Sequence, residues 1–244
     1  MNSTLVTYTR LSPKHGGKRL SKIDRISPHC VVGQWTVEQI GREFSESARQ
    51  ASCNYGIGKD GRIVLIVDED NRSFCTSNRF NDDRAITIDC ASDTKHPYAF
   101  PEKTFESLVD LCEDICKRHG KTKLVWIPNK DRALTYNVRS NEMLLTVHRW
   151  FAQKACPGDW LINRMDLLAN TVTERLNDMT EAEVNKLIDK RLESYFNTKE
   201  SASDWAVDEI NDAVARGITD GSRPRAIARR EEVMLMMIRD LGGK

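Results

Sequence analysis

The sequence predicts an α/β fold in which helices flank a central mixed β-sheet, followed by a small all-helical C-terminal module. Short apolar runs at 63–67 and 123–127 are typical of buried strands. Helical periodicity lies between such runs, most clearly at 101–120. Strands that alternate with helices favour one sheet with helices packed on it. The length of 244 residues suits one substantial domain and a small one.

The clearest predicted helix spans 101–120 and ends at Gly120. Cys112 and Cys116 share its apolar face, where thiols are expected in the core rather than at a metal. A shorter helix is predicted at 35–44, where Thr36 can serve as N-cap with Gln39 as its capping-box partner. A third helix, running from Trp160 through Leu176, is expected to close the domain.

Two predicted strand regions carry polar side chains of interest. Residues 51–67 predict a β-hairpin, because an Asp-Gly pair separates two strand-like runs. Tyr55 lies on the first of these strands. A further strand is predicted at 84–91, and its alternation places Asp89 on the face opposite to Ile88.

Charge and composition limit the classes of partner. The formal net charge of +1 gives no reason to propose a nucleic acid. No apolar run is long enough to span a bilayer, and the N-terminus lacks a hydrophobic signal core, so we expect a cytoplasmic protein in the producing cell. The seven cysteines show no small-domain disulfide pattern, which favours a reducing compartment. Residues 1–20 are expected either to pack on the domain or to form a solvated arm.

The stretch 146–159 contains the strongest functional signal. It places His148, Lys154 and Cys156 in order, and a Pro-Gly turn follows the cysteine. An apolar run precedes His148, so the imidazole is expected at the end of a buried element, with Lys154 and Cys156 on the following loop. Imidazole nitrogen and thiolate sulfur are preferred ligands of zinc, and a catalytic zinc needs three protein ligands. One further ligand must therefore come from elsewhere.

His29 is the best candidate for the third ligand among the five histidines. It ends a short strand-like segment, although Pro28 would then lie at a sheet edge or at the end of the strand. His15 and His96 lie in loop-like segments, and His119 lies at a helix end where a cation suits the helix dipole. The alternative for any single histidine is a hydrogen-bonded structural role.

Taken together, His29, the hairpin tyrosine and the His-Lys-Cys-Pro-Gly order resemble the zinc-dependent N-acetylmuramoyl-L-alanine amidases. These enzymes share a fold with the peptidoglycan-recognition proteins and include many phage endolysins. The resemblance covers roughly residues 20 to 170. It implies that His29, His148 and Cys156 bind zinc. It also implies that the protein cuts peptidoglycan between N-acetylmuramic acid and L-alanine during host lysis.

The resemblance also implies roles for three further residues. Tyr55 is expected near the zinc, where it would orient or stabilise the attacked carbonyl. Lys154 would stabilise the oxyanion. Asp89 takes the place of a longer glutamate, and would either assist proton transfer or form hydrogen bonds in the cleft wall. The alternatives are a protein that recognises peptidoglycan without cutting it, and a purely structural zinc.

The remainder of the chain predicts a helical linker at 177–200 and a helical module at 201–244, after a catalytic domain at 1–176. The module resembles one S-layer-homology repeat in three places: Trp205-Ala206, the glycines of 217–221, and Arg229-x-Glu231. Ala228 replaces the threonine usual in that family. The module is expected to bind a secondary cell-wall polymer or to mediate self-association.

Overall fold

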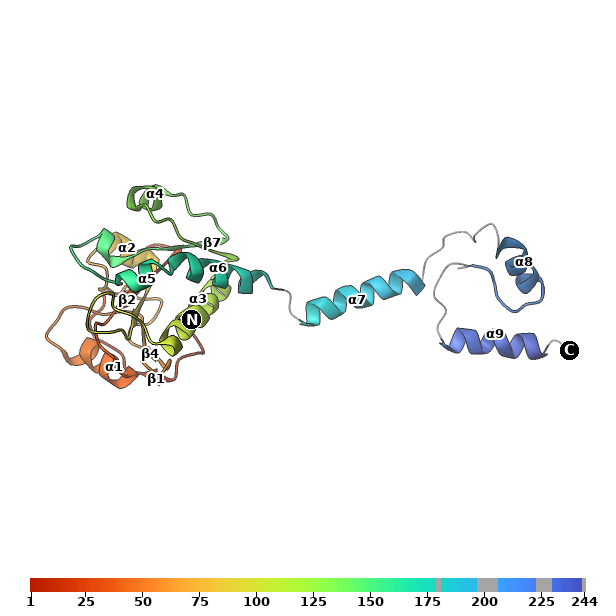
Figure 1. Ribbon diagram of the computed structural model, residues 1–244, viewed down its shortest axis with the longest axis horizontal. Helices are drawn as coiled ribbons and strands as arrows, with labels where there is room; N and C mark the ends of the chain where they lie inside the picture. The colour runs from red at the N-terminus through yellow and green to blue at the C-terminus, as the bar shows by residue number, and fades with distance from the viewer. Residues whose placement is uncertain (179–180, 197–205, 223–229, 243–244) are drawn as a thin grey trace. The chain divides into compact units, whose positions relative to one another are not determined.

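The computed structural model describes residues 1–178, 181–196, 206–222 and 230–242 (Figure 1). The chain divides into two compact units, Met1–Asp178 and Met179–Lys244. The finer predicted division into a linker helix and a terminal module stays a prediction.

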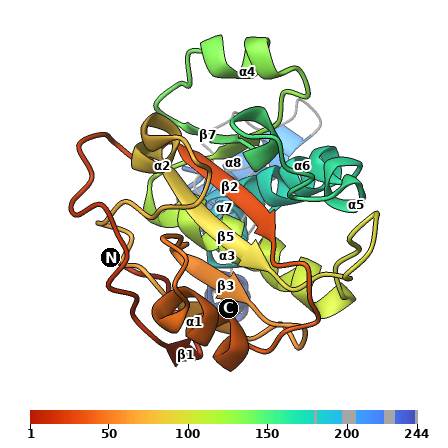
Figure 2. The same cartoon turned by 90° about the vertical axis from the view of Figure 1, so that its left-hand side faces the viewer.

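The first unit contains a seven-stranded mixed sheet with the order β1-β4-β3-β5-β2-β7-β6, which confirms the predicted α/β architecture. The strands are β1 Tyr8–Thr9, β2 Arg25–Cys30, β3 Tyr55–Ile57, β4 Ile63–Leu65, β5 Ala85–Cys90, β6 Lys123–Val125 and β7 Glu142–Leu145. The predicted hairpin is confirmed as the antiparallel pair β3–β4, and the other strand pairs are parallel. Figure 2 shows β2 and β5 side by side in the middle of the unit.

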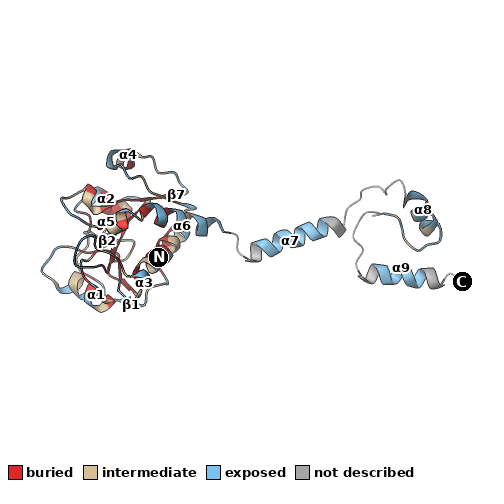
Figure 3. Ribbon diagram, in the orientation of Figure 1, coloured by how far each residue is buried: buried red, intermediate tan, exposed pale blue. Residues whose placement is uncertain are grey.

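Helices cover both faces of this sheet. They are α1 Val37–Glu46, α2 Arg79–Arg84, α3 Glu102–Arg118, α4 Lys130–Thr135, the 3-10 helix η1 His148–Trp150, α5 Asp159–Ile162 and α6 Met165–Asn177. A large buried cluster joins one face to α3 and α6, and a smaller one joins the other face to α1. The strands β2, β3, β4, β5 and β7 between these layers are buried (red in Figure 3). The sheet therefore separates two hydrophobic core clusters, one on each face.

Two predicted helices are confirmed and a third is divided. Thr36 caps α1, and both hydrogen bonds of the predicted capping box with Gln39 are present. The helix predicted at 101–120 is α3, with Cys112 and Cys116 buried in the core. The helix predicted from Trp160 to Leu176 is wrong as a single element. It breaks where Arg164, at φ −118 and ψ 4, leaves the helical conformation between α5 and α6.

Pro28 lies in a central strand rather than at an edge of the sheet. Pairing between β2 and β7 ends at Ile26 and Leu145, whereas β2 continues beside β5 through Cys30. The Ile26 carbonyl accepts a hydrogen bond from Thr146 on the β7 side. In a strand, the backbone groups of residues two positions apart point to the same side, so the backbone nitrogen of Pro28 also faces the β7 side. The missing N–H of Pro28 therefore faces a region where the regular ladder has already ended.

The first residues of the chain pack on the domain. β1 pairs with β4, and the Thr7 amide donates to the Ile63 carbonyl at 2.9 Å. Of the two alternatives for residues 1–20, the structure supports the packed one for this segment.

The second unit contains α7 Glu181–Phe196, α8 Val207–Ala215 and α9 Arg230–Gly242 within its described ranges. The apolar stripe predicted for α7 is exposed, since Val184, Leu187, Ile188 and Leu192 are each at least 40% exposed. Trp205, Ala228 and Arg229, which carry part of the S-layer-homology resemblance, lie outside the described residues. Among the helices that are described, none combines the length and the apolar character needed to cross a bilayer.

Candidate metal centre and cleft

The structure brings His29, His148 and Cys156 together. His29 is the last residue but one of β2, His148 begins η1, and Cys156 lies on the loop that follows. The Cys156 Sγ lies 3.2 Å from His29 Nδ1, and the two imidazole centroids are 5.0 Å apart. Possible ligand atoms of the three residues lie within 4.8 Å of one another. Within the described residues, His96 and His119 belong to no such group.

A backbone hydrogen bond and an ion pair hold the loop that carries Cys156 against η1. The Arg149 amide donates to the Cys156 carbonyl at 3.2 Å, and the Arg149 guanidinium pairs with Asp159 at 2.8 Å. Gly158 adopts φ +91, a conformation that side chains disfavour, and an added Cβ would lie 2.8 Å from the Pro97 carbonyl oxygen. The Pro-Gly turn read from the sequence thus places the thiol beside the imidazoles.

The chemistry of these three side chains fits a zinc ion. Burial, followed by the neighbouring His148, lowers the pKa of His29 well below its usual value. Burial, followed by Lys154, also lowers the pKa of His148. Both rings are therefore neutral, which is the form that binds metals. His29 is only 2% exposed, and its Nε2 has no hydrogen-bond partner. Burial also raises the pKa of Cys156, so a buried thiolate there needs a cation beside it.

A cleft of about 530 Å³ opens over this cluster. Besides the three candidate ligands, its lining includes Trp35, Cys75, Asp89, Tyr98 and Lys154. Lys154 is exposed, and its ammonium has no hydrogen bond or ion pair within the described part of the chain. A second groove of about 440 Å³ runs along α1 and shares Trp35, Glu43 and Ser47 with the cleft. The cluster is therefore open to a large substrate.

Asp89 lies beside His29 in the cleft. The two residues are directly paired between the parallel strands β5 and β2, so their side chains leave the same face of the sheet. Asp89 is 6% exposed, and burial raises its pKa to about 6, although hydrogen bonds from Cys75 and Cys53 oppose this rise. A carboxyl group with a pKa in this range can accept or release a proton near neutral pH.

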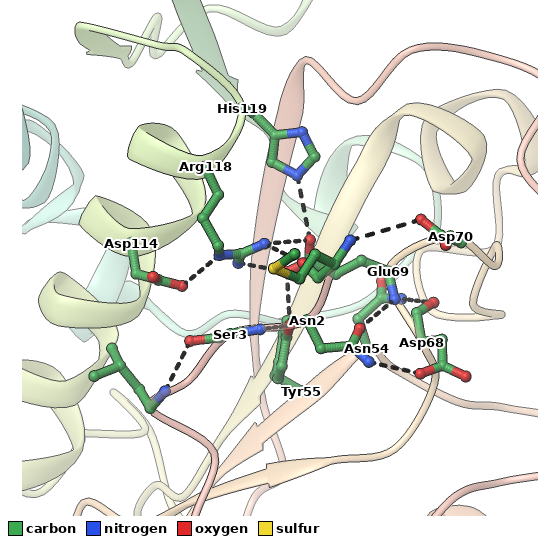
Figure 4. Close-up of polar contacts among 12 residues, drawn as sticks. Asn2, Ser3, Asn54, Tyr55, Asp68, Glu69, Asp70, Asp114, Arg118 and His119 are labelled. Carbon is green, nitrogen blue, oxygen red and sulfur yellow. Dashed lines mark hydrogen bonds and ion pairs between the residues drawn. The ribbon is translucent and has the colours of Figure 1, made fainter.

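Tyr55 does not join the site, and the expectation that it contacts the attacked carbonyl is wrong for this geometry. Tyr55 pairs with Ile88, whereas Gly56 pairs with Asp89, so the tyrosine leaves the opposite face of the sheet. Its hydroxyl donates to Glu69 Oε1 at 2.6 Å and accepts from the Ser3 amide at 2.9 Å (Figure 4). Tyr55 instead joins the first residues of the chain to the buried core.

Glu69 is the centre of this second polar cluster (Figure 4). Arg118 donates to its two carboxylate oxygens at 2.7 and 2.8 Å, and His119 Nε2 lies 3.2 Å away. Burial alone would raise the pKa of Glu69, but hydrogen bonds from His119, Arg118 and Tyr55 lower it to about 2. Burial and the Glu69 carboxylate raise the pKa of Tyr55. The cluster therefore holds a permanent carboxylate and a neutral phenol on the face away from the cleft.

Sequence reasoning missed Cys75 and Ser77 as residues of the site. The Cys75 thiol donates to Asp89 Oδ2 at 3.6 Å, and Ser77 Oγ lies 3.3 Å from His148 Nε2. Both belong to an irregular segment between β4 and α2. Such a segment has no hydrophobic period from which a side chain's direction could be read.

Comparison with solved structures finds proteins that are similar to this chain. The AmpD selenomethionine derivative is 17% identical, with a TM-score of 0.50 over 69% of this chain and 96% of that one. The Staphylococcus aureus hydrolase AmiA, solved with its ligand, is 13% identical with a TM-score of 0.49, over 72% of this chain and 91% of that one. PlyL is 15% identical with a TM-score of 0.47, over 68% and 95%. At these identities the likeness concerns the fold alone.

A search of curated proteins finds no match. The profile of the N-acetylmuramoyl-L-alanine amidases, in contrast, matches residues 19–159, a span that includes His29, Asp89, His148 and Cys156. Because this match covers more than half of the sequence, the chain belongs to the N-acetylmuramoyl-L-alanine amidase family.

Proposed function

We propose that this protein is a zinc-dependent peptidoglycan hydrolase that cleaves the amide between N-acetylmuramic acid and L-alanine. The observation that carries the proposal is the convergence of His29, His148 and Cys156 at the base of an open cleft. Three ligands leave a position open for substrate, and this favours a catalytic over a structural zinc.

His29, His148 and Cys156 would hold the ion through two neutral imidazoles and a thiolate. When bound, zinc supplies a Lewis acid that polarises an amide carbonyl and lowers the pKa of water. His29 is fixed by the pairing of β2 with β5, and Cys156 by the turn at Gly158. The protein therefore presents the ligands on rigid elements, which limits reorganisation during the reaction.

Lys154 and Asp89 would handle the charge and the protons of the reaction. Water adds its oxygen to the carbonyl carbon, the C–N bond breaks, and the products are a carboxylate and the amine of alanine. The Lys154 ammonium lies at the cleft without a competing partner among the described residues, so it can stabilise negative charge that develops on the carbonyl oxygen. Asp89 can take a proton from the attacking water and deliver it to the leaving nitrogen.

The test is hydrolysis of purified cell walls by the full-length protein. We expect turbidity to fall, new N-terminal alanines to appear, and chelator to stop both until zinc is restored. A Cys156→Ser variant should lose zinc and activity together. Clearing that ignores chelator, or new reducing sugars in place of alanine amines, would contradict the amidase assignment. Tight binding to cell walls without release of alanine amines would instead support a recognition protein.

We also propose that the protein acts in bacterial lysis as an endolysin, held in the cytoplasm until it is released onto the cell wall. Its free cysteines and open cleft fit this setting. The second unit would then attach the enzyme to a secondary wall polymer or to another copy of the chain.

A further inference from the structure

A single irregular loop, residues 73–77, contacts the cleft at two points. Cys75 donates its thiol hydrogen to Asp89 Oδ2, and Ser77 brings its hydroxyl to His148 Nε2. Asp89 lies on β5 and His148 begins η1, so the two residues come from different elements. The loop therefore touches both a candidate zinc ligand and the candidate proton carrier.

Asp82 fixes this loop from α2. Its carboxylate accepts from the Cys75 amide at 3.1 Å and from the Thr76 amide at 3.0 Å, and also from the Thr76 hydroxyl at 2.6 Å. Asp82 is itself only 3% exposed. Three donors on one buried carboxylate leave the backbone of Cys75 little freedom, since releasing any of them would remove a hydrogen bond from a buried acceptor.

The loop is also fastened to the strands below it. Phe74 and Ser52 exchange two hydrogen bonds of 3.0 Å, and Ser73 Oγ lies 2.7 Å from Thr87 Oγ1. Thr87 precedes Asp89 by two residues on β5, so it lies on the same face of the sheet. These hydrogen bonds therefore fix the position of the loop relative to the strand that carries Asp89.

The carboxylate of Asp89 has few contacts of its own. The Cys75 thiol donates to Asp89 Oδ2 at 3.6 Å, and the buried Cys53 thiol also donates a hydrogen bond to this carboxylate. An aspartate has a short side chain and cannot move far toward a substrate. Its direction must therefore be set by its neighbours, and a thiol donor such as Cys75 can do this.

We propose that Cys75 is a positioning residue, and that the 73–77 loop, fixed by Asp82, aims the Asp89 carboxylate at the substrate amide. This inference rests on the proposed amidase function. It predicts that the Cys75 contact matters to turnover only through Asp89, and that any side chain able to donate a hydrogen bond from the same place can replace the thiol.

The experiment compares kcat and KM for release of alanine amines from a soluble N-acetylmuramoyl-peptide, using the full-length zinc-loaded protein. Cys75→Ala should lower kcat about fivefold, the effect expected of one modest hydrogen bond, with KM and zinc content unchanged. Cys75→Ser should recover kcat to within about twofold, because a hydroxyl can also donate. In an Asp89→Asn background, Cys75→Ala should cause no further loss.

Cys112→Ala is the matched control, since it removes a buried thiol from α3 on the other face of the sheet. It should lower the unfolding temperature without changing kcat. Full turnover in Cys75→Ala, an equal loss in Cys75→Ser, or a second fivefold loss in the Asp89→Asn background would overturn the inference while leaving the amidase activity intact. A wild-type protein that releases no alanine amine would overturn the proposed function itself.

Discussion

Replacing Tyr55 by phenylalanine separates a structural from a catalytic role for this residue. The change removes the hydroxyl that donates to Glu69 at 2.6 Å and accepts from Ser3 at 2.9 Å, and it leaves the ring in place. A hydrogen bond to a charged group is worth about 1.5–3 kcal/mol. Arg118 and His119 still bind the carboxylate. We therefore expect the free energy of unfolding to fall by about 2 kcal/mol.

The loss can be measured by urea unfolding followed by tryptophan fluorescence, because Trp35, Trp126, Trp150 and Trp160 all lie in the first unit. A domain of this size should show an unfolding temperature lower by roughly 4–8 °C. The rate of alanine-amine release should stay within twofold of the wild type under conditions where the variant is folded. Removal of a donor that stabilises an oxyanion would instead lower kcat by about 10²-fold.

Tyr136→Phe serves as the control for Tyr55→Phe. Tyr136 also donates to a carboxylate, Glu142, at 2.7 Å, but it is only half-buried. Because this hydrogen bond is half-exposed, removal of the Tyr136 hydroxyl should lower the free energy of unfolding by less than 1 kcal/mol, within the range of ~0.5–1.5 kcal/mol for ordinary hydrogen bonds. A Tyr55→Phe protein as stable as the wild type but more than tenfold slower would refute the structural assignment and return Tyr55 to the active site.

Three further predictions concern the acid sensitivity of the fold, the metal loop and the second unit. The pKa of Glu69 is lowered from 4.5 to about 2, so ionised Glu69 contributes about 3 kcal/mol to the free energy of unfolding. This contribution is complete above pH 5 and declines as the pH falls toward 2, so urea unfolding between pH 7 and pH 3 should show the loss in the wild type and not in Glu69→Gln. Parallel pH profiles of stability for the two proteins would contradict this. Gly158→Ala adds a Cβ at φ +91 and should weaken zinc binding about tenfold by calorimetry, whereas unchanged affinity would show that the loop tolerates the strain. The exposed apolar stripe of α7 predicts that the full chain self-associates and that residues 1–178 alone sediment as a monomer; a monomeric full chain would argue for the wall-polymer role instead.

Much of the fold could be predicted because the deciding signals are local. The capping box at Thr36, the Asp-Gly turn of the β3–β4 hairpin and the apolar stripe of α3 each depend on residues within a few positions of one another. The break between α5 and α6 could not be predicted in the same way. Apolar residues keep helical spacing across it, from Leu161 to Met165 and Leu168, so the period continues although the helix does not.

The same difference between local and tertiary signals decides which residues of the site could be predicted. His148, Lys154 and Cys156 lie close together in the sequence, and their order, with the family resemblance it supports, predicts that they share one site with His29; all four line the cleft. Tyr55 was misplaced because strand alternation shows which residues share a face, but not which face turns toward the cleft. That choice depends on the register of β3 against β5, and a shift of one residue reverses it. Cys75 reaches Asp89 through a loop held by Asp82, a tertiary arrangement without a local signature.

The alternation of β3 and β5 has a consequence for how this enzyme can change. Asp89, which we propose takes part in the chemistry, lies on one face of the sheet, and Tyr55, which binds Glu69, lies on the other. Substitutions that retune cleavage toward a different wall chemistry need not disturb the anchor behind it. Variants hardened against acid or heat can likewise be selected without altering what the cleft accepts. Because the backbone of the sheet lies between these two groups of side chains, substrate preference and stability can evolve, or be engineered, almost independently.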